Sequence, residues 1–493
     1  MDLKTIRSVL IGVFCLILLS TGSVSGAGFA LIEQGTSGLG NSFAGGSASA
    51  QDATTVFFNP AGMTKIPTQS VAAANLIVPY FTFENEGSSH RTDPALRGNN
   101  GGDAGVAKVT PNLYYVQKID RLAVGIGINA PFGLATKYDN GWVGRYHAIE
   151  SDLSNININP SVAYRVNKQF SIGGGLNIGY VKATLTNAVD FGSFIGSAQN
   201  ADGFVKLKGD AWGAGWNVGL LYEFTKDTRV GAAYRSKVRY TLEGNARFSN
   251  VPGALAALPN FKNDDISAHL TTPDSLSVSF FHSFNPKWSI MGDVTWTNWS
   301  AFDELRIRFD NGRTDSVVTT EWREVFRYSL GVTFTPNKAW TLRAGTAYDQ
   351  APVPSDRRRT ARIPDADRLW LSFGAGYGFT DALTFNVACA HLFINDTKIT
   401  KSTADPEDNR RSIKAVNSKR RLIVHSSWQQ HKSDSFLLSA MSWFSPVRLT
   451  VVPLCAMRFA LCFRSDQHRI LASSHPRIFC SYRRYLQYLL IKA

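Results

Sequence analysis

Residues 211–224 read AWGAGWNVGLLYEF, and the pattern of this stretch decides the fold class. Large apolar side chains alternate with small or polar ones along it. The apolar face consists of Trp212, Trp216, Val218, Leu220, Tyr222 and Phe224. A two-residue period predicts a β-strand. Strands of a soluble sandwich are usually about 5 or 6 residues long, whereas a longer run with aromatic residues near its ends is typical of a strand that faces lipid.

The same alternation recurs at 122–133 and 321–334, and turn residues separate thirteen such segments. The connections alternate between tight turns, such as Asn167-Lys168, and long polar loops, such as 85–104. Tight turns at one end and long loops at the other are typical of an outer-membrane barrel. We therefore predict an all-β fold, a transmembrane antiparallel β-barrel, with strands near 71–84, 105–119, 121–138, 149–166, 169–189, 203–225, 228–249, 264–284, 287–309, 321–335, 339–351, 367–380 and 383–398.

The N-terminus has the order of a secretory signal peptide. Lys4 and Arg7 precede the apolar run 9–19, and small residues follow it. We expect cleavage near Gly26 or Ala27. A retained membrane anchor is the alternative, but the run is too short for a spanning helix. No other segment is long and apolar enough for a membrane helix, which excludes a helical bundle.

The net charge of +14 is concentrated in the C-terminal tail. Residues 412–493 contain 13 Lys and Arg against 2 Asp and Glu, so the preceding part is close to neutral. The tail has no aromatic platform and no recognition motif, and we therefore expect no nucleic-acid binding. The five cysteines form neither a disulfide framework nor a metal-ligand spacing.

The tail also ends the strand pattern. Thirteen is an odd number, whereas bacterial single-chain barrels have an even number of strands, so a closing strand is missing after Lys398. Beyond Arg411 the alternation stops, and arginines interrupt the apolar runs. We interpret the tail as the product of a shifted reading frame that begins near the codons for Arg410 to Arg421. A genuine basic extension is the alternative.

Residues 28–67 differ from the strand segments in composition and pattern, because they are rich in small residues and lack sustained alternation. Ordered motifs begin in this segment and recur along the chain. They are Ala27-Gly28-Phe29, Ser37-Gly38-Leu39-Gly40, Asn59-Pro60-Ala61-Gly62-Met63, Tyr138 to Tyr146, Gly209 to Asn217, Tyr234-Arg235-Ser236, Pro352-Val353-Pro354, Ile363-Pro364-Asp365 and Asp367-Arg368. From about residue 27 to about residue 400 the chain resembles the FadL/TodX family of outer-membrane transporters for long-chain fatty acids and other hydrophobic compounds.

The resemblance implies a barrel of fourteen strands with an N-terminal hatch inside it. The chain would then comprise a signal peptide at 1–26, a hatch at 27–68, a barrel at 69–400, and a loop with the aberrant basic tail at 401–493. It also implies passive uptake, in which extracellular loops capture the ligand and an internal site receives it. The ligand then leaves sideways at a kink in the third strand.

By this resemblance, the kink lies at Asn129, Pro131 and Gly133. Proline has no N–H for the ladder and glycine weakens a strand, although an ordinary bulge is the alternative. The resemblance places the hatch turn Asn59-Pro60-Ala61 against the kink, where movement of the hatch could open it. Lateral exit suits an acyl chain, since exposure to water costs about 0.8 kcal/mol per CH₂.

Two cations are candidates for binding a ligand carboxylate. Arg323 matches the basic position of the family, and the alternation from Trp322 points it inward. Lys182 is the second candidate, but it shares the parity of Ile178 and Tyr180 and faces outward unless a bulge intervenes. For both residues the alternative is a charge without a ligand role, because barrel interiors are polar in any case.

We expect uptake without a cofactor or metal, and we expect no enzymatic activity, since the sequence has no HExxH motif and no Gly-x-Ser-x-Gly nucleophile elbow. The expected partners are a long-chain fatty acid or similar hydrophobic molecule, outer-membrane lipid and the barrel assembly machinery. The expected state is a monomer in the outer membrane of a Gram-negative-type cell. Uptake of aromatic hydrocarbons, a structural or adhesin barrel and an outer-membrane enzyme are the alternatives.

Overall fold

The computed structural model describes residues 28–92, 95–408 and 411–431. The signal peptide predicted at 1–26 and most of the basic tail, at 432–493, lie outside the described residues. In the described ranges, no helix is long and apolar enough to span a membrane.

The described strands form a wall of fourteen positions, eight continuous and six interrupted. The continuous positions are β1 (Gln69–Asn85), β2 (Lys108–Ile119), β5 (Glu150–Arg165), β6 (Phe170–Asp190), β7 (Asp202–Glu223), β16 (Trp340–Asp349), β17 (Arg368–Gly378) and β20 (Lys414–His431). The interrupted positions are β3 with β4 (Leu122–Asn129, Gly133–Lys137), β8 with β9 (Thr228–Arg235, Val238–Ser249), β10 with β11 (Asp264–Thr272, Ser275–Asn285), β12 with β13 (Trp288–Thr297, Glu304–Phe309), β14 with β15 (Ser316–Thr319, Val325–Phe334) and β18 with β19 (Leu383–Ile394, Thr397–Thr400).

Antiparallel pairing joins these positions in chain order and closes them into a ring. β18 pairs with β20, and β20 pairs with β1 from Ser70 opposite His431 to Asn85 opposite Ala415. The predicted antiparallel barrel and its thirteen strands are confirmed, but the prediction that the closing strand is missing is wrong. The ladder is built from backbone groups, which every residue except proline can supply, so β20 pairs without side-chain alternation. The proposed shift of reading frame stays a prediction.

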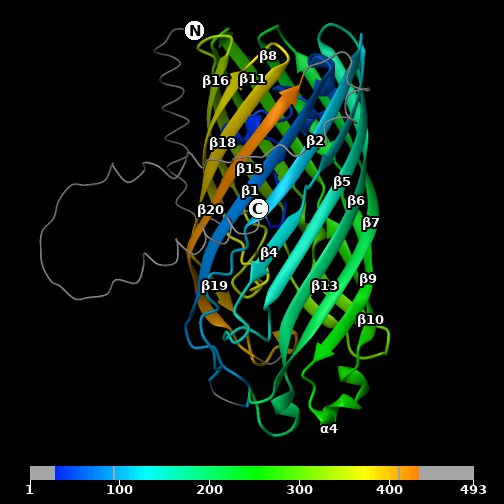
Figure 1. The fold of residues 1–493 in the computed structure, drawn as a ribbon, viewed down its shortest axis with the longest axis vertical. Helices are drawn as coiled ribbons and strands as arrows, with labels where there is room; N and C mark the ends of the chain where they lie inside the picture. The colour runs from blue at the N-terminus through cyan, green and yellow to red at the C-terminus, as the bar shows by residue number, and fades with distance from the viewer. Residues whose placement is uncertain (1–27, 93–94, 409–410, 432–493) are drawn as a thin grey trace, which may run out of the picture. The chain divides into compact units, whose positions relative to one another are not determined.

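The two ends of the barrel differ in their connections (Figure 1). The end drawn at the top has tight turns; one of them contains Asp120, whose φ of 51° is left-handed. The opposite end carries the long loops. Short helices lie in these connections and breaks: η2 (Phe191–Phe194), α4 (Gly253–Ala256), η3 (Pro259–Phe261), η4 (Trp299–Ala301) and η5 (Pro406–Asp408).

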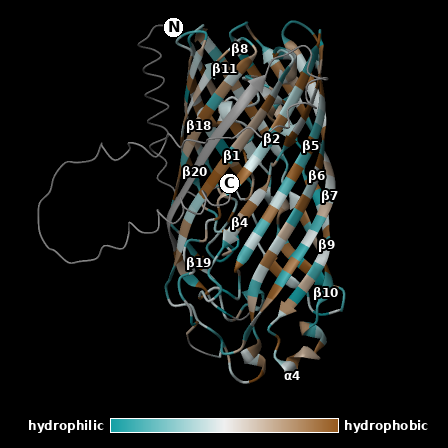
Figure 2. Ribbon diagram, in the orientation of Figure 1, coloured by the Kyte–Doolittle hydropathy of each residue, from teal (hydrophilic) through white to brown (hydrophobic). Residues whose placement is uncertain are grey.

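The burial along β7 shows which way its side chains point. Trp212 and Phe224 are 63% and 57% exposed, whereas Asn217 and Leu221 are 3% and 1% exposed. The aromatic residues of the apolar face therefore point outward, whereas the opposite face, with Asn217 and Leu221, points into the interior. Figure 2 shows the resulting alternation of hydrophobic and hydrophilic residues along the strands.

The hatch occupies the inside of the barrel. It contains α2 (Thr36–Gly40), α3 (Thr55–Phe58) and η1 (Pro60–Lys65). α2 packs against β16, β17 and β18, and η1 packs against β5, β6 and β7. The hatch thus contacts the wall on two sides, and the space that it leaves free forms the cavities described below.

The register of the closing strand predicts a disulfide. Ala74 lies opposite Ser427, and directly paired strand residues are close enough for an S–S bond. In a background with the five native cysteines changed to serine, we expect Ala74→Cys with Ser427→Cys to oxidise and to shift the mobility of the heat-denatured, unreduced chain. Ala74→Cys with Trp428→Cys is the control, because Trp428 pairs with Ala73 and not with Ala74. Equal oxidation of both pairs would contradict this register.

Candidate functional site

Polar contacts fasten the hatch to the inner wall. Asn41 donates from Nδ2 to the carbonyl of Val332 at 2.9 Å, and Lys65 forms an ion pair with Glu223 at 2.6 Å. The backbone of Ser47 lies so close to Gly231 that a Cβ there would overlap it. These contacts hold the hatch at fixed points while leaving space elsewhere.

The turn Asn59-Pro60-Ala61 is the most buried of these points. Asn59 donates from Nδ2 to the carbonyls of Ser47 at 2.6 Å and Leu220 at 2.9 Å, and its Oδ1 accepts from the Ala61 N–H at 3.0 Å. Asn59 has no solvent exposure. The turn therefore lies against β6 and β7, and its expected meeting with the kink of the third strand stays a prediction.

A second contact of the turn explains why it sits there. The wall residues that face it are Gly173 on β6 and Gly219 on β7, and a Cβ on either one would overlap Asn59 or Pro60. Glycine is the residue that permits such close approach of two backbones. The position of the turn thus depends on the pair of wall glycines.

The third strand breaks at the residues that the sequence indicated. β3 ends with Asn129 opposite Asn157, and β4 begins with Gly133 opposite Ser154. The chain advances four residues from Asn129 to Gly133, whereas the paired positions on β5 differ by three residues, from Asn157 to Ser154. The broken strand therefore contains one extra residue, as in a β-bulge. Pro131 lies inside this break and has no N–H to donate.

The break leaves a gap in the ladder between β2 and β4. The β2–β3 register runs only to Leu113 opposite Ile128, so residues 108–112 of β2 have no partner on that side among the described strands. As a strand, β4 pairs only with β5; on its other side an isolated bridge joins Thr136 to Gly105, and the N–H of Lys137 donates to the carbonyl of Ala104 at 3.0 Å. The wall is therefore not continuous at this position.

The first described residues of the hatch cover the gap. Leu31 N–H donates to the carbonyl of Pro131 at 2.8 Å, and Gly133 N–H donates to the carbonyl of Phe29 at 2.9 Å. Ala30 and Phe132 form an isolated antiparallel bridge between these two bonds. We name residues 28–31 the cover segment, because they give the broken strand a backbone partner.

Phe29 anchors the cover segment in an aromatic cluster. Its ring centroid lies 4.7 Å from Trp299, 5.5 Å from Phe302, and 5.9 Å from both Trp322 and Phe132. The preceding residue, Gly28, has a φ of 63°, and a Cβ on it would lie 2.6 Å from the Trp299 ring. Only glycine fits this space and conformation.

An acidic loop residue holds the start of the cover segment. The N–H of Gly28 donates to Oδ2 of Asp365 at 2.6 Å, and Arg368 forms an ion pair with the same carboxylate at 3.1 Å. Burial raises the pKa of Asp365 to about 6, although Arg368 and the Gly28 N–H oppose this shift. The segment is thus held by both a polar and an aromatic contact.

The cover segment borders two cavities. The inner cavity encloses about 1180 Å³ of empty space, including the part that opens to solvent, and Ala30, Leu31, Pro131 and Phe132 line it. Its charged lining residues are Glu33, Arg235, Asp293, Arg327, Asp349 and Arg368. The outer cavity encloses about 820 Å³ on the same measure. Its lining is largely leucine, isoleucine, alanine and phenylalanine, with Phe29 at one side.

Arg327 is the buried cation whose donors are least satisfied. Its Nη2 donates to the carbonyl of Ser42 at 2.8 Å, whereas its Nε and Nη1 have no hydrogen-bond partner. The side chain is 5% exposed and lines the inner cavity. Buried N–H groups without an acceptor are costly, so an anion in the cavity would find donors ready.

The two cations predicted from sequence lie elsewhere. Arg323 is exposed, precedes the first residue of β15 and lines neither cavity; its role in ligand binding stays a prediction. Lys182 is exposed on the outer face of β6, as its parity indicated, and does not line either cavity. The inward cation is Arg327, four residues further along and of the same parity as Arg323.

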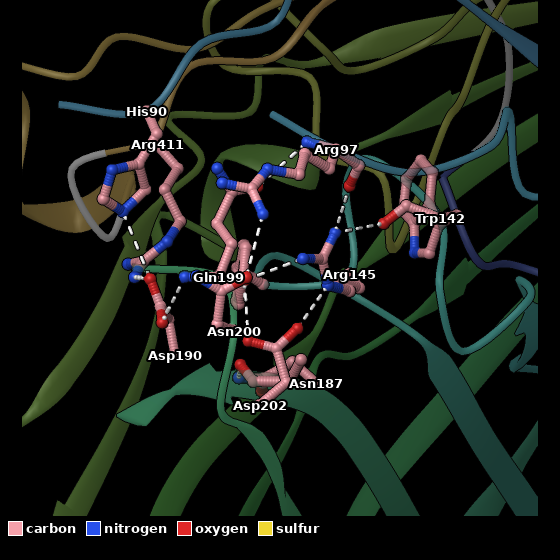
Figure 3. Close-up of polar contacts among 12 residues, drawn as sticks. His90, Arg97, Trp142, Arg145, Asn187, Asp190, Gln199, Asn200, Asp202 and Arg411 are labelled. Atoms are coloured by element: carbon pink, nitrogen blue, oxygen red, sulfur yellow. Dashed lines mark hydrogen bonds and ion pairs between the residues drawn. The ribbon is translucent and has the colours of Figure 1, made fainter. Parts of the chain in front are cut away.

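Hydrogen bonds and ion pairs connect the long loops to one another (Figure 3). Asp190, at the end of β6, accepts from Nη2 of Arg411 at 2.9 Å and lies 3.3 Å from Nε2 of His90. Arg145 forms an ion pair with Asp202 at 2.7 Å. These contacts join the loops that follow β1, β4, β6 and β19.

One histidine of this loop region is held neutral. Burial, and secondarily the cation of Lys401, lowers the pKa of His147 to about 3. Its Nε2 lies 3.1 Å from the carbonyl of Arg411, which requires the N–H tautomer at that atom. The neutral imidazole of His147 therefore keeps its hydrogen bond to the Arg411 carbonyl at neutral pH.

Comparison with known proteins gives consistent matches. Residues 17–424 match the model of the family described as outer membrane protein transport protein (OMPP1/FadL/TodX). The chain is 34% identical over 411 residues to the long-chain fatty acid transport protein of Escherichia coli O6:H1, with 78% of this chain and 90% of that protein covered. It is 33% identical over 409 residues to outer membrane protein P1 of Haemophilus influenzae, with 76% and 88% covered.

Solved structures share the fold. The crystal structure of a Pseudomonas aeruginosa FadL homologue matches with a TM-score of 0.76 at 24% identity, covering 82% of this chain and 100% of that one. The Ralstonia pickettii toluene transporter TbuX matches with a TM-score of 0.59 at 20% identity and the same coverage. At these identities the likeness concerns the fold alone.

The buried hatch turn predicts a stability effect. Asn59→Ala removes three hydrogen bonds at a site without solvent exposure, and we expect the free energy of unfolding to fall by about 2–3 kcal/mol. Urea unfolding in detergent and proteolysis of the hatch measure this change. Asn245→Ala, on the outer face of β9, is the control. Unchanged unfolding and proteolysis of Asn59→Ala would show that the turn does not hold the hatch.

Proposed function

The chain belongs to the FadL/TodX family of outer-membrane transport proteins, and we propose that it takes up long-chain fatty acids passively through its two cavities. It resides in the outer membrane of a Gram-negative-type cell. The name of the Escherichia coli relative, a long-chain fatty acid transport protein, supports the substrate class.

The observation that carries the proposal is the order of the two cavities. The outer cavity is almost entirely apolar and lies toward the long loops, which suits the capture of an acyl chain. The inner cavity adds charged groups and borders the strand break through Pro131 and Phe132. Phe29 borders the outer cavity, and Ala30 and Leu31 border the inner one, so a ligand that passes inward would displace the cover segment.

Arg327 would bind the carboxylate of the ligand. The Nε and Nη1 groups that lack partners can each donate a hydrogen bond to a carboxylate oxygen. Glu33, Asp293 and Asp349 also line this cavity, so its total charge is balanced rather than strongly positive. Electrostatic attraction of the ligand carboxylate would thus be limited to the surroundings of the Arg327 guanidinium, which favours readily reversible binding.

The ligand would leave through the gap between β2 and β4. Movement of the cover segment breaks the two backbone hydrogen bonds to Pro131 and Gly133, the hydrogen bonds of Gly28 to Asp365 and of Gln34 to the Leu31 carbonyl, and the Phe29 contacts. An acyl chain that leaves sideways enters the hydrocarbon layer directly and avoids about 0.8 kcal/mol of hydration cost per CH₂. In this mechanism the cover segment, rather than the Asn59-Pro60-Ala61 turn, is the moving part of the hatch.

Aromatic hydrocarbons are the second candidate ligands. The cluster of Trp299, Phe302 and Trp322 around Phe29 could accept a neutral ring in place of the phenylalanine. A solved toluene transporter has this fold. The relatives are transport proteins rather than enzymes, and they lend no support to an adhesin or purely structural barrel.

We also propose that the protein works as a monomer in outer-membrane lipid after insertion by the barrel assembly machinery. No cofactor enters this mechanism. Among the described residues no group of three or more His, Cys, Asp or Glu could hold a metal ion. Flux would then follow the concentration gradient of the ligand.

A substitution at Arg327 separates the two ligand classes. We expect Arg327→Gln to weaken oleate binding by about 10-fold or more, because a charge-assisted hydrogen bond contributes about 1.5–3 kcal/mol. Binding of oleyl alcohol, which has the same chain but no carboxylate, should change little. Fluorescence titration of the purified barrel measures both, and Arg323→Gln is the control. If both ligands weaken equally, or neither does, Arg327 does not recognise the carboxylate.

A disulfide tests lateral exit. Ala30 and Phe132 are directly paired, so cysteines at both positions should bond and fix the cover segment over the gap. In the cysteine-free background, we expect the oxidised barrel to lose oleate uptake into proteoliposomes and to regain it after reduction. The two single-cysteine variants are the controls. Full uptake by the oxidised barrel would rule out movement of this segment.

A further inference from the structure

The loop between β16 and β17, residues 350–367, contains four arginines, and three of them have acidic partners. The three ion pairs are Arg357 with Asp405 at 3.1 Å, Arg358 with Glu321 at 2.6 Å and Arg359 with Asp356 at 2.6 Å. The fourth arginine, Arg362, forms no ion pair with any described residue. It is therefore the arginine of this loop whose charge the described part of the protein leaves unpaired.

The guanidinium of Arg362 contacts neutral oxygens at the loop end of β5 and β6. The acceptors of Nη1 are the carbonyl of Glu150 at 3.3 Å, Oγ of Ser151 at 3.1 Å and the carbonyl of Thr186 at 3.4 Å. Nη2 donates to Oδ1 of Asn187 at 3.1 Å. Nε has no acceptor among the described residues. The group is thus held in place while part of its donor capacity stays unused.

Arg362 lines the outer cavity, whose lining is otherwise largely apolar. The other fully charged residues of this lining are Asp152 and Lys208. Asp152 pairs with Lys108 at 2.5 Å, and Lys208 is exposed on β7, whereas Arg362 is half-buried. Because water screens an exposed charge more than a half-buried one, an anion in this cavity is attracted more strongly by Arg362 than by Lys208.

A smaller cavity adjoins the outer cavity at Arg362. It encloses about 560 Å³ of empty space on the same measure. The lining residues that the two cavities share are Phe302, Leu305, Arg362 and Ile363. The smaller cavity alone is lined by His147, Lys401, Glu407 and Asp408. Arg362 thus lies where an apolar space meets a more polar one, which suits a ligand with an apolar chain and a charged head.

Arg362 keeps its positive charge at neutral pH. Burial lowers its pKa to about 10, and no nearby acid opposes this shift. A cation that has lost part of its hydration without gaining an acidic partner carries an uncompensated desolvation cost. An anion that enters the cavity from outside would supply the missing partner.

We propose that Arg362 binds the carboxylate of a long-chain fatty acid whose chain lies in the outer cavity. The ligand then has a first charged contact at the loop side of the barrel, before it reaches Arg327 in the inner cavity. A neutral aromatic hydrocarbon gains nothing from this contact. The inference rests on the proposed uptake of fatty acids and adds to it a separate site of recognition.

The test isolates the outer cavity. Oxidised Ala30→Cys with Phe132→Cys, in the cysteine-free background, fixes the cover segment, and we call this protein the locked barrel. Fluorescence titration measures its binding of oleate and of oleyl alcohol. The variants are Arg362→Gln, which removes the charge, and Asn187→Asp, which gives the guanidinium an acid partner within the protein. The matched control is Arg357→Gln, because Arg357 belongs to the same loop and its side chain is 64% exposed.

We expect the locked barrel to bind oleate at least 10-fold more tightly than oleyl alcohol. Both variants should lose most of this preference and the control should keep it, while all three retain the heat-modifiable mobility and the oleyl alcohol affinity of the parent. If one variant does not fold, the other variant and the preference of the parent decide. The inference is overturned if the parent does not prefer oleate, if the folded variants keep the preference, or if both ligands weaken equally.

Failure of this inference and failure of the proposed function give different results. In the barrel without the disulfide, Arg327→Gln still weakens oleate relative to oleyl alcohol if the inference about Arg362 alone is wrong. If neither Arg327→Gln nor Arg362→Gln changes this ratio, recognition of a fatty acid carboxylate is refuted at both sites. The same comparison decides if the disulfide does not form, because Arg362→Gln should then still weaken oleate more than oleyl alcohol.

Discussion

Every backbone N–H and C=O that crosses hydrocarbon needs a partner within the protein, and this requirement governs the whole barrel. It explains why the wall closes on itself through β20, although that strand lacks the side-chain pattern of its neighbours. It also bears on the break in the third strand. Residues Phe29 and Leu31 supply the acceptor and donor that Gly133 and Pro131 would otherwise lack.

The cover segment therefore serves two purposes with the same atoms. Its backbone gives the broken strand hydrogen-bond partners, and its residues border both cavities, Phe29 the apolar one and Ala30 and Leu31 the charged one. The rest of the hatch is fixed by buried contacts such as those of Asn59. In the proposed mechanism, the cover segment moves while the rest of the hatch stays fixed, so the barrel opens at one place and the other contacts stay intact.

The sequence predicts the wall well because a two-residue period survives in nearly every strand. The sequence does not predict β20, because the pairing of this strand depends on the free edges of β1 and β18 and not on alternation in its own sequence. Of the two arginines on the predicted inward face, Arg323 precedes β15 and lines neither cavity, whereas Arg327 lies in β15 and lines the inner cavity. Contacts between the cover segment and the third strand join positions about a hundred residues apart, and no local pattern records such a pairing.

The β1–β20 seam has a consequence for how the chain folds. Ser70 and His431 meet only after nearly the whole described chain has been placed, which is a contact of very high sequence separation. Such contacts slow folding, since loop closure must precede any gain from the ladder. The hatch is attached directly before β1 and lies inside the ring, so it has to enter while the seam is still open. Sealing of the seam is therefore the step that commits the barrel to having its plug inside.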